Sequence, residues 1–264
     1  MLIKLNKSVN ELGLNLDFKD FIILIPARIG STRLNEKLLI EVNGTPIIMH
    51  VFQSAKKADL NIPILVATDN EKILNIVNKN GGKAIMTKST HESGSDRIHE
   101  ALNKFDPIRR FKKIIHLQGD LPNVSKKLIS NLAKIILNQK CIATPIVKAS
   151  EEEVNDPNVV KCVASFQHEN PKIDDVGRAL YFSRTKVPWG SENIWHHLGI
   201  YAWDREILDK FIQLGSSTLE KSEKLEQLRA LEANIEIKIL LTNEKPIGID
   251  TIEDLKLFKN SFKK

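Results

Sequence analysis

The stretch that decides the fold is Phe21–Lys37, which reads FIILIPARIGSTRLNEK. Its first five residues are apolar and rich in isoleucine, a pattern that predicts a buried strand. After Pro26 the composition changes to a segment with one glycine, Gly30, and several basic side chains. Open α/β sheets bind ligands beyond the carboxyl ends of their strands, so we expect this segment to be a binding loop.

Strand and helix patterns alternate through the first half of the chain. Each apolar run of strand length is followed by a segment of helical period, in the pairs 21–25 and 46–58, 62–68 and 71–80, 84–86 and 96–104, and 113–117 and 126–138. This repetition predicts an α/β fold with a mostly parallel, twisted sheet flanked by helices.

After Cys141 this rhythm changes. Three strand patterns come with little helix between them, and two helices, a strand and a last helix follow, at 159–165, 179–183, 197–202, 205–214, 220–233, 235–241 and from 251 onward. We predict an N-terminal extension over residues 1–20 and a single domain over 21–264. Within that domain, a core of 21–145 is followed by a smaller α+β subdomain at 146–235 and completed by 236–264.

The composition excludes several classes of protein. The 264 residues are 42% hydrophobic, and the net charge of +6 comes from lysines spread along the chain. Only 6% are aromatic, so a nucleic-acid surface is not expected and a small anionic substrate fits better. Cys141 and Cys162 lack zinc-site spacing and are predicted to be reduced core residues. Early charged residues argue against a signal peptide, and no apolar run reaches membrane-spanning length, so we expect a cytoplasmic protein without membrane insertion.

The loop after the first strand is neither a dinucleotide-binding fingerprint nor a P-loop, because those motifs need several glycines at fixed spacing. It offers Arg28, Arg33 and Lys37 together with backbone amides around Gly30. Such a set of donors suits a polyphosphate. The alternative is an ordinary basic surface loop.

Two aspartates stand where a divalent cation could be held. Asp120 follows the predicted strand at 113–117, with Gly119 permitting close approach of the backbone, and Asp250 precedes the final helix. Mg²⁺ takes one or two carboxylates together with water and phosphate oxygens, so this pair could bind it. Taken alone, each could instead be a turn or helix-cap aspartate.

From about residue 21 to the C-terminus, the motifs resemble those of the 3-deoxy-manno-octulosonate (Kdo) cytidylyltransferases, also called CMP-Kdo synthetases. Those of the first half are shared loosely by many sugar nucleotidyltransferases: IPARIGSTRL at 25–34 with Lys37, ATD at 67–69, SGSDR at 93–97 and QGDLP at 118–122. Those of the second half are more specific: NVVK at 158–161, ALYFSR at 179–184, PW at 188–189, HLGIY at 197–201, LEQLR at 225–229 and IDT at 249–251.

This resemblance implies a nucleotide-diphospho-sugar transferase-like fold and an enzyme that joins CTP to the acidic sugar Kdo. The products would be CMP-Kdo, for lipopolysaccharide synthesis, and pyrophosphate, with Mg²⁺ as the cofactor. The core would bind the nucleotide, and the subdomain at 146–235 would bind the sugar and form a homodimer.

The resemblance also implies roles for individual residues. Catalysis falls to Arg28, Arg33, Lys37 and Asp120, and metal binding to Asp120 and Asp250. The nucleotide would be bound by Arg28, Ser31, Arg33 and Lys37 at its triphosphate and by Ser93, Arg97 and Gln118 on the cytidine side. The sugar would be bound by Arg33, Arg184, His197, Tyr201, Glu226 and Gln227.

Other interpretations remain open at this point. His197 and Tyr201 could be satisfied core residues. The sequence also departs from the family pattern, because Asn35 and Glu36 replace proline and glycine before the lysine, and Leu121 replaces an acid. A related enzyme such as CMP-sialic acid synthetase is one alternative, and a catalytically idle nucleotide-binding homologue is another. A glycosyltransferase is disfavoured, since those enzymes usually carry a DxD motif that residues 120–122 lack.

Overall fold

The computed structural model describes residues 18–30 and 34–262, and the chain divides into two compact units. The split unit comprises the described residues of 18–130 and 246–264, and the continuous unit comprises 131–245. The predicted subdomain boundaries after residues 145 and 235 both fall inside the continuous unit. Most of the predicted N-terminal extension lies outside the described residues.

The split unit is built on four parallel strands, in the order β6-β1-β4-β5. They are β1 (Phe21–Ala27), β4 (Ile64–Thr68), β5 (Ala84–Met86) and β6 (Lys113–His116). Every residue of β1 is buried, which explains why its sequence is an unbroken apolar run rather than an alternating one. The alternation in the sequence therefore predicted this half of the fold correctly.

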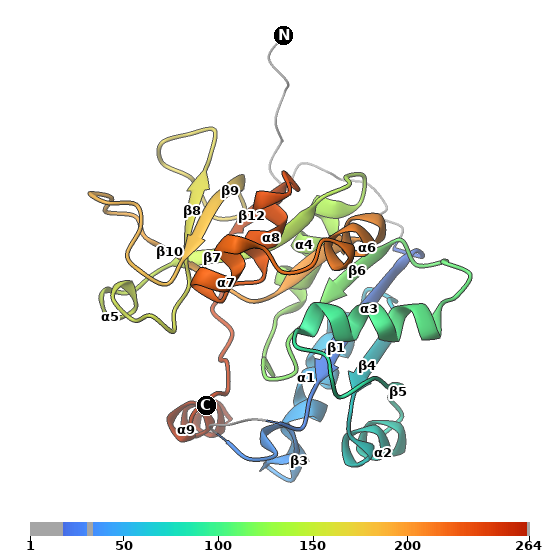
Figure 1. Cartoon of the computed structure of the whole chain (residues 1–264). Coiled ribbons are helices and arrows are strands. Elements are labelled where there is room, and N and C mark those ends of the chain that lie inside the picture. Colours follow the sequence, from blue (N-terminus) through green and yellow to red (C-terminus); the bar gives the residue numbers. More distant parts are fainter. Residues whose placement is uncertain (1–17, 31–33, 263–264) are drawn as a thin grey trace. The chain divides into compact units, whose positions relative to one another are not determined.

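Helices cover both faces of these strands (Figure 1). They are α1 (Ile47–Lys57), α2 (Glu71–Lys79) and α3 (Gly94–Phe105), and shorter elements are η2 (Lys37–Leu39), β2 (Glu41–Val42) and β3 (Thr45–Pro46). Helices α1 and α2 contact each other, whereas α3 crosses in front of β1 and β4 in the view of Figure 1. This follows from right-handed crossovers, because the chain moves outward from β1 to β5 and then returns to the other side of β1 as β6.

The remaining segment of the split unit is α9 (Ile252–Ser261) near the C-terminus, and α4 (Lys126–Ile136) carries the chain across the boundary into the continuous unit. Helix α9 begins at Thr251 with a capping box, in which the Thr251 side chain accepts from the backbone N–H of Asp254 and the Asp254 side chain accepts in return. The helix cap is therefore Thr251 and not Asp250.

The continuous unit holds six strands with mixed pairing. They are β7 (Ile142–Lys148), β8 (Lys161–Ser165), β9 (Val176–Ser183), β10 (Trp195–His197), β11 (Tyr201–Asp204) and β12 (Ile237–Leu241). Strand β12 is parallel to β7, and β10 and β11 are antiparallel to β7. Strands β8 and β9 pair antiparallel with each other, as do β9 and β12. Its helices are α5 (Glu151–Val154), α6 (Arg205–Gln213), α7 (Thr218–Glu223) and α8 (Gln227–Glu232).

The mostly parallel description holds for the split unit alone, whereas the pairing of this unit is mixed; an α+β character was predicted for residues 146–235, which lie inside it. Short connections without a crossover helix return the chain antiparallel, and an apolar run such as β7 looks the same in either direction. The predicted helix over 220–233 is divided into α7 and α8 at Lys224, which takes a left-handed conformation with φ 54°. None of the helices within the described ranges has the length and apolar character needed to cross a membrane.

Candidate active site

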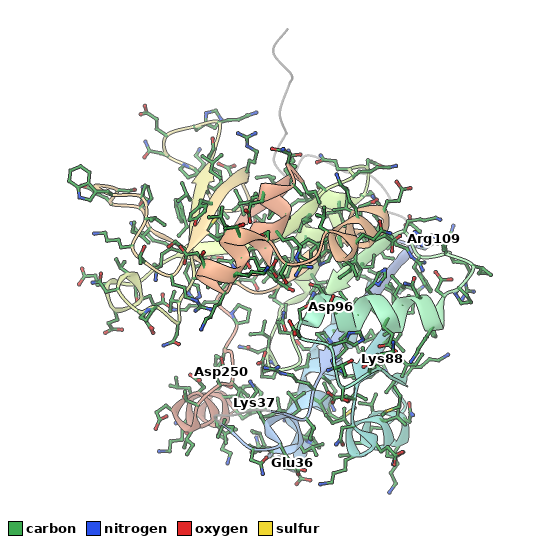
Figure 2. The ribbon with its side chains drawn as sticks, viewed as in Figure 1. Glu36, Lys37, Lys88, Asp96, Arg109 and Asp250 are labelled. Atoms are coloured by element: carbon green, nitrogen blue, oxygen red, sulfur yellow. The ribbon has the colours of Figure 1, made fainter. Side chains whose placement is uncertain are left out.

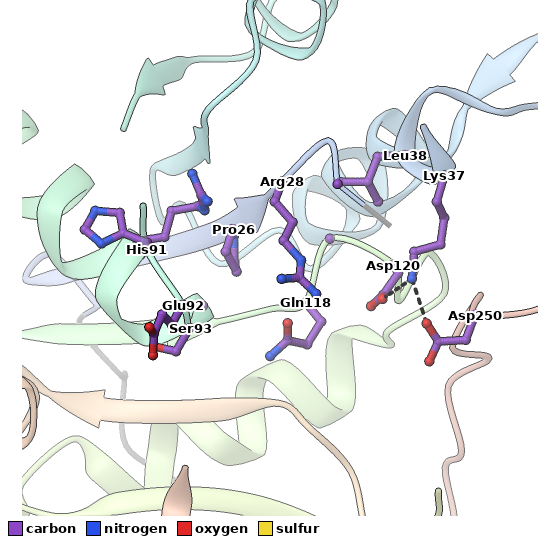
Figure 3. Close-up of a pocket in the computed structure, with 14 residues that line it drawn as sticks. Pro26, Arg28, Lys37, Leu38, His91, Glu92, Ser93, Gln118, Asp120 and Asp250 are labelled. Carbon is purple, nitrogen blue, oxygen red and sulfur yellow. Dashed lines mark hydrogen bonds and ion pairs between the residues drawn. The ribbon is translucent and has the colours of Figure 1, made fainter. Parts of the chain in front are cut away.

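A cleft of about 260 Å³ lies in the split unit at the carboxyl ends of β1 and β6 (Figure 3). The strand order reverses between these two strands, and loops diverge at such a point to leave room for a ligand. The residues that line the cleft are Pro26, Arg28, Gly30, Lys37, Leu38, His91, Glu92, Ser93, Gly94, Arg97, Gln118, Gly119, Asp120 and Asp250. Seven of the predicted nucleotide and metal residues thus share one cavity: Arg28, Lys37, Ser93, Arg97, Gln118, Asp120 and Asp250.

Lys37 is the centre of a three-residue charge cluster in this cleft. Its Nζ donates to Asp120 Oδ2 at 2.7 Å and to Asp250 Oδ1 at 2.8 Å. Burial opposes the positive charge, but the two aspartates outweigh that effect and raise the pKa of Lys37 above its ordinary value. Figure 2 shows the side chains of Lys37 and Asp250 from the two separate segments of the split unit.

Asp120 is held in place by close backbone packing. A Cβ atom on Gly119 would lie 2.6 Å from the carbonyl oxygen of Pro26, so only glycine fits between the end of β6 and the end of β1. The backbone N–H of Ile249 donates to the carbonyl oxygen of Asp120 at 3.0 Å. This bond ties the segment that carries Asp250 to the loop that carries Asp120.

The two aspartates fit a divalent metal ion. Their carboxylate oxygens already converge on one cation, the ammonium group of Lys37, and carboxylate oxygens are the hard ligands that Mg²⁺ prefers. Among the described residues there is no group of three or more His, Cys, Asp or Glu side chains that could hold a metal ion. An ion bound here would therefore complete its coordination with water and phosphate oxygens.

The N-terminus of α3 forms the opposite wall. Ser93 caps the helix, because its Oγ accepts from the backbone N–H of Asp96 at 3.1 Å and donates to the Asp96 carboxylate at 2.8 Å. A Cβ atom on Gly94 would lie 3.2 Å from the ring of buried His116, so glycine lets the helix start close to β6. The positive end of the helix dipole therefore faces the cleft, as in many anion sites.

Arg28 and Arg97 differ in how their charges are used. Arg28 is exposed and extends into the cleft beside Gln118 (Figure 3). Arg97 is only 2% exposed, and its guanidinium donates to Thr87 Oγ1 at 2.7 Å and to Asp69 Oδ2 at 2.9 Å. The predicted site residues Ser31 and Arg33 lie outside the described residues.

The five remaining sugar-site residues lie in the continuous unit. His197 and Tyr201 are buried with ring centroids 5.5 Å apart, and the Thr144 hydroxyl lies 2.9 Å from His197 Nε2. Burial lowers the pKa of His197 to about 3 and raises that of Tyr201, so both rings are neutral at neutral pH. Arg184 donates from Nε and Nη1 to the backbone carbonyls of Glu223 and Pro157.

The other two of these five residues lie at the start of α8. Glu226 immediately precedes α8 and Gln227 is its first residue, 5% exposed. The neighbouring Arg229 donates to Glu220, at 2.8 Å from Nε and 2.5 Å from Nη2.

Comparison with known proteins identifies the family. A family model described as cytidylyltransferase matches residues 22–239. The 3-deoxy-manno-octulosonate cytidylyltransferase of Bartonella quintana (strain Toulouse) is 49% identical over 236 residues, which cover 89% of this chain and 95% of that protein. The chain belongs to the 3-deoxy-manno-octulosonate cytidylyltransferase family. The 3-deoxy-manno-octulosonate cytidylyltransferase of Brucella anthropi is 47% identical over 234 residues, which cover 88% of this chain and 92% of that protein.

Solved structures agree with this cytidylyltransferase assignment. A structure of CMP:2-keto-3-deoxy-manno-octonic acid synthetase complexed with CTP matches with a TM-score of 0.83 and 33% identity, covering 92% of this chain and 98% of that one. The 4-diphosphocytidyl-2C-methyl-D-erythritol synthase from Anaerococcus prevotii, at 17% identity and a TM-score of 0.62, shares the fold. The resemblance predicted from the motifs is therefore confirmed, as is the prediction of a cytidylyltransferase enzyme.

Several residues at the cleft were not predicted from the sequence. His91 and Glu92 line the cavity, and Asp69 binds Arg97 beside it. Asp69 was visible in the ATD motif at the end of β4, and its place at a strand end was the available signal. Nothing in the sequence showed that its partner would be Arg97.

Proposed function

We propose that this cytidylyltransferase transfers CMP from CTP to Kdo, releasing pyrophosphate and activating the sugar for lipopolysaccharide synthesis. The observation that carries the proposal is the cluster of Lys37, Asp120 and Asp250 in a cleft lined by basic and amide donors. Membership of the family supplies the expected substrates, since its relatives carry the name of this reaction.

Each predicted nucleotide-binding residue is assigned to the part of CTP that its place in the cleft suits. Arg28 and Lys37, with Ser31 and Arg33 of the same loop, would bind the triphosphate. Ser93 at the start of α3 and Gln118 after β6 would contact the cytidine side. Buried Arg97 of α3 would hold this part of the cleft in place through its bond to Asp69. Exposed Arg28 is suited to direct contact with a phosphate, because arginine binds phosphoryl oxygens with two parallel donors.

Nucleotidyltransferases typically use a divalent metal ion, and we assign Mg²⁺ to Asp120 and Asp250. When bound, the ion would supply neutralisation of phosphoryl charge. Lys37 holds the two carboxylates close together through its paired hydrogen bonds.

The reaction is an in-line attack of the anomeric hydroxyl of the sugar on the α-phosphorus of CTP. The oxygen–phosphorus bond forms as the bond to pyrophosphate breaks, the hydroxyl proton is lost to solvent, and no covalent enzyme intermediate is required. Arg28 and Lys37 stabilise the charge that moves onto the leaving pyrophosphate. Rate enhancement then comes from positioning and charge stabilisation.

The sugar would be bound by Arg33, Arg184, His197, Tyr201, Glu226 and Gln227. A neutral His197 is suited to a hydroxyl rather than to the sugar carboxylate, which leaves the charged contact to arginine. This division assigns carboxylate recognition to Arg33 or Arg184 and hydroxyl recognition to the buried side chains.

We also propose a homodimer that acts in the cytoplasm, where CTP is available. Exposed apolar side chains of the continuous unit support an association surface, because Trp189 is 98% exposed, Leu180 47% and Ile173 44%. Sedimentation equilibrium would give twice the chain mass, and Trp189→Ser should weaken the association.

The function is tested by measuring pyrophosphate release with Mg²⁺, using the four nucleoside triphosphates against Kdo and sialic acid. CTP with Kdo should be the productive pair, and release with sialic acid instead would favour a CMP-sialic acid synthetase. Asp120→Asn keeps the side-chain shape but removes the charge, and it should lower kcat/KM by about a thousandfold or more. Asp59→Asn is the matched control, because Asp59 lies in the same unit with a 90% exposed side chain.

A further inference from the structure

Asp69 joins two elements that meet at the nucleotide cleft. It follows β4 directly, and its Oδ1 accepts a hydrogen bond from the backbone N–H of Ile29 at 3.2 Å. Its Oδ2 accepts from Arg97 Nη2 at 2.9 Å. One carboxylate therefore holds both the loop after β1 and the helix α3.

Both terminal nitrogens of the Arg97 guanidinium have partners within the protein. Besides Asp69, its guanidinium donates from Nη1 to Thr87 Oγ1 at 2.7 Å and to the carbonyl oxygen of Lys88 at 3.3 Å. Thr87 is fixed in turn, since its hydroxyl donates to the carbonyl oxygen of Thr68 at 3.0 Å. The side chains of Arg97 and Asp69 are only 3% and 10% exposed. A buried guanidinium with these partners is a structural anchor rather than an open ligand for a nucleoside.

The loop needs such an anchor, because its own glycine does not determine its course. A Cβ atom on Gly30 would meet nothing within 4 Å, and Gly30 does not have a positive φ. Ile29 stands between Arg28 and Gly30, so a hydrogen bond on its N–H restrains the peptide directly after Arg28. Fixing that peptide limits the directions in which the Arg28 side chain can leave the backbone.

We propose that Asp69 is a positioning residue for the triphosphate: it aligns the loop of Arg28 through Ile29, and it aligns the start of α3 through Arg97. Arg97 serves the same purpose and does not contact the nucleotide by itself. The proposal rests on the assignment of the cleft to CTP. It adds a specific cause for the loop geometry. The ion pair between Asp69 and Arg97 connects the end of β4 to α3, and the hydrogen bond from Ile29 to Asp69 connects the loop after β1 to both.

The experiment measures CTP binding to the full chain by isothermal titration calorimetry, alongside steady-state kinetics. Asp69→Ala should raise the Kd and KM for CTP about tenfold, because it removes a charge-assisted bond and the backbone bond together. Asp69→Asn should raise them about threefold, since the amide oxygen can still accept from Ile29. The KM for Kdo should stay within twofold of the wild-type value for both variants.

The matched control is Glu220→Gln, which removes the charge from another buried ion pair. Arg229 and Glu220 have side chains 7% and 13% exposed and lie in the continuous unit. This variant should lower the melting temperature as Asp69→Asn does, yet leave the Kd for CTP unchanged. An equal rise in Kd for Glu220→Gln, or a Kd within twofold of wild type for both Asp69 variants, would overturn the proposal.

The proposed function and the role of Asp69 can be refuted separately. A wild-type chain that binds CTP but releases no pyrophosphate with Kdo would refute the proposed function, and the CTP affinities of the variants would still decide the role of Asp69. A chain with normal turnover and unaltered CTP affinity in Asp69→Ala would refute the role of Asp69 alone.

Discussion

The two units use their polar residues in opposite ways. In the split unit, Asp120 and Asp250 form ion pairs with Lys37, and the side chains of the two aspartates are partly exposed, at 30% and 48%. In the continuous unit, His197 and Tyr201 are buried and held neutral. The partly exposed aspartates can exchange their ion partner for a ligand, whereas the buried neutral rings can only offer hydrogen bonds. We therefore expect charge-based contacts in the cleft of the split unit and hydrogen-bonded contacts at His197 and Tyr201.

The strongest test of this contrast is to remove the positive charge of Lys37 from the cleft. Lys37→Met keeps the length of the side chain but leaves Asp120 and Asp250 facing each other without their shared donor. We expect kcat/KM for CTP to fall by about 100-fold to 1,000-fold. Steady-state pyrophosphate release would measure this, with the exposed Lys79→Met of α2 as the control. A fall of less than about fivefold would remove Lys37 from the reaction.

Acid stability tests the buried side of the comparison in both units at once. Burial lowers the pKa of His116 and His197 to about 3 each, below the ordinary value of 6.5. Their contribution is complete above pH 6.5 and is lost progressively as the pH falls toward 3, because the unfolded chain takes up protons first. At pH 5 each should cost about 2 kcal/mol of unfolding free energy.

Urea unfolding between pH 7 and pH 5 would measure this loss before most carboxylates titrate. His116→Gln and His197→Gln should each make the pH dependence shallower. A dependence identical to that of the wild type would show that the replaced histidine takes up its proton in the folded state as readily as in the unfolded chain.

The role of His197 can be separated from its packing. His197→Phe keeps an aromatic ring beside Phe182, at a present ring distance of 4.9 Å, but removes both ring nitrogens. We expect the KM for Kdo to rise about tenfold, with the KM for CTP unchanged. Phe182→Leu is the packing control, and it should lower stability without this selective effect. Equal changes in both KM values would indicate a core histidine.

The smallest effect is expected where the loop departs from the family pattern. Glu36 takes a left-handed conformation with φ 47°, and its carboxylate pairs with Lys72 Nζ of α2 at 2.8 Å. Lys72→Gln should raise the KM for CTP about twofold to threefold at low salt, because the unpaired charge of Glu36 then repels the triphosphate. The double variant with Glu36→Gln should return to the wild-type value. Lack of this recovery would show that Lys72 acts in some other way.

The sequence by itself determined the alternating half of the fold. Strands β1, β4, β5 and β6 and the helices between them were predicted within a few residues, because burial on both faces produces unbroken apolar runs between amphipathic helices. It also predicted the basic loop and the two aspartates, since residue type and place at a strand end are local properties. For the continuous unit, the loss of alternation predicted a smaller α+β subdomain but not which strands would pair parallel and which antiparallel, because the apolar run of a buried strand is the same for either direction of its neighbour.

Only the tertiary structure decided which charges meet. Lys37 reaches Asp120 across 83 positions of sequence and Asp250 across 213. Asp69 meets Arg97 across 28 positions. Such pairs depend on which strand ends the folded sheet brings together, and no short-range pattern encodes that. The residue types of the cleft could therefore be predicted from the sequence, whereas their hydrogen-bond and ion-pair partners follow from the fold.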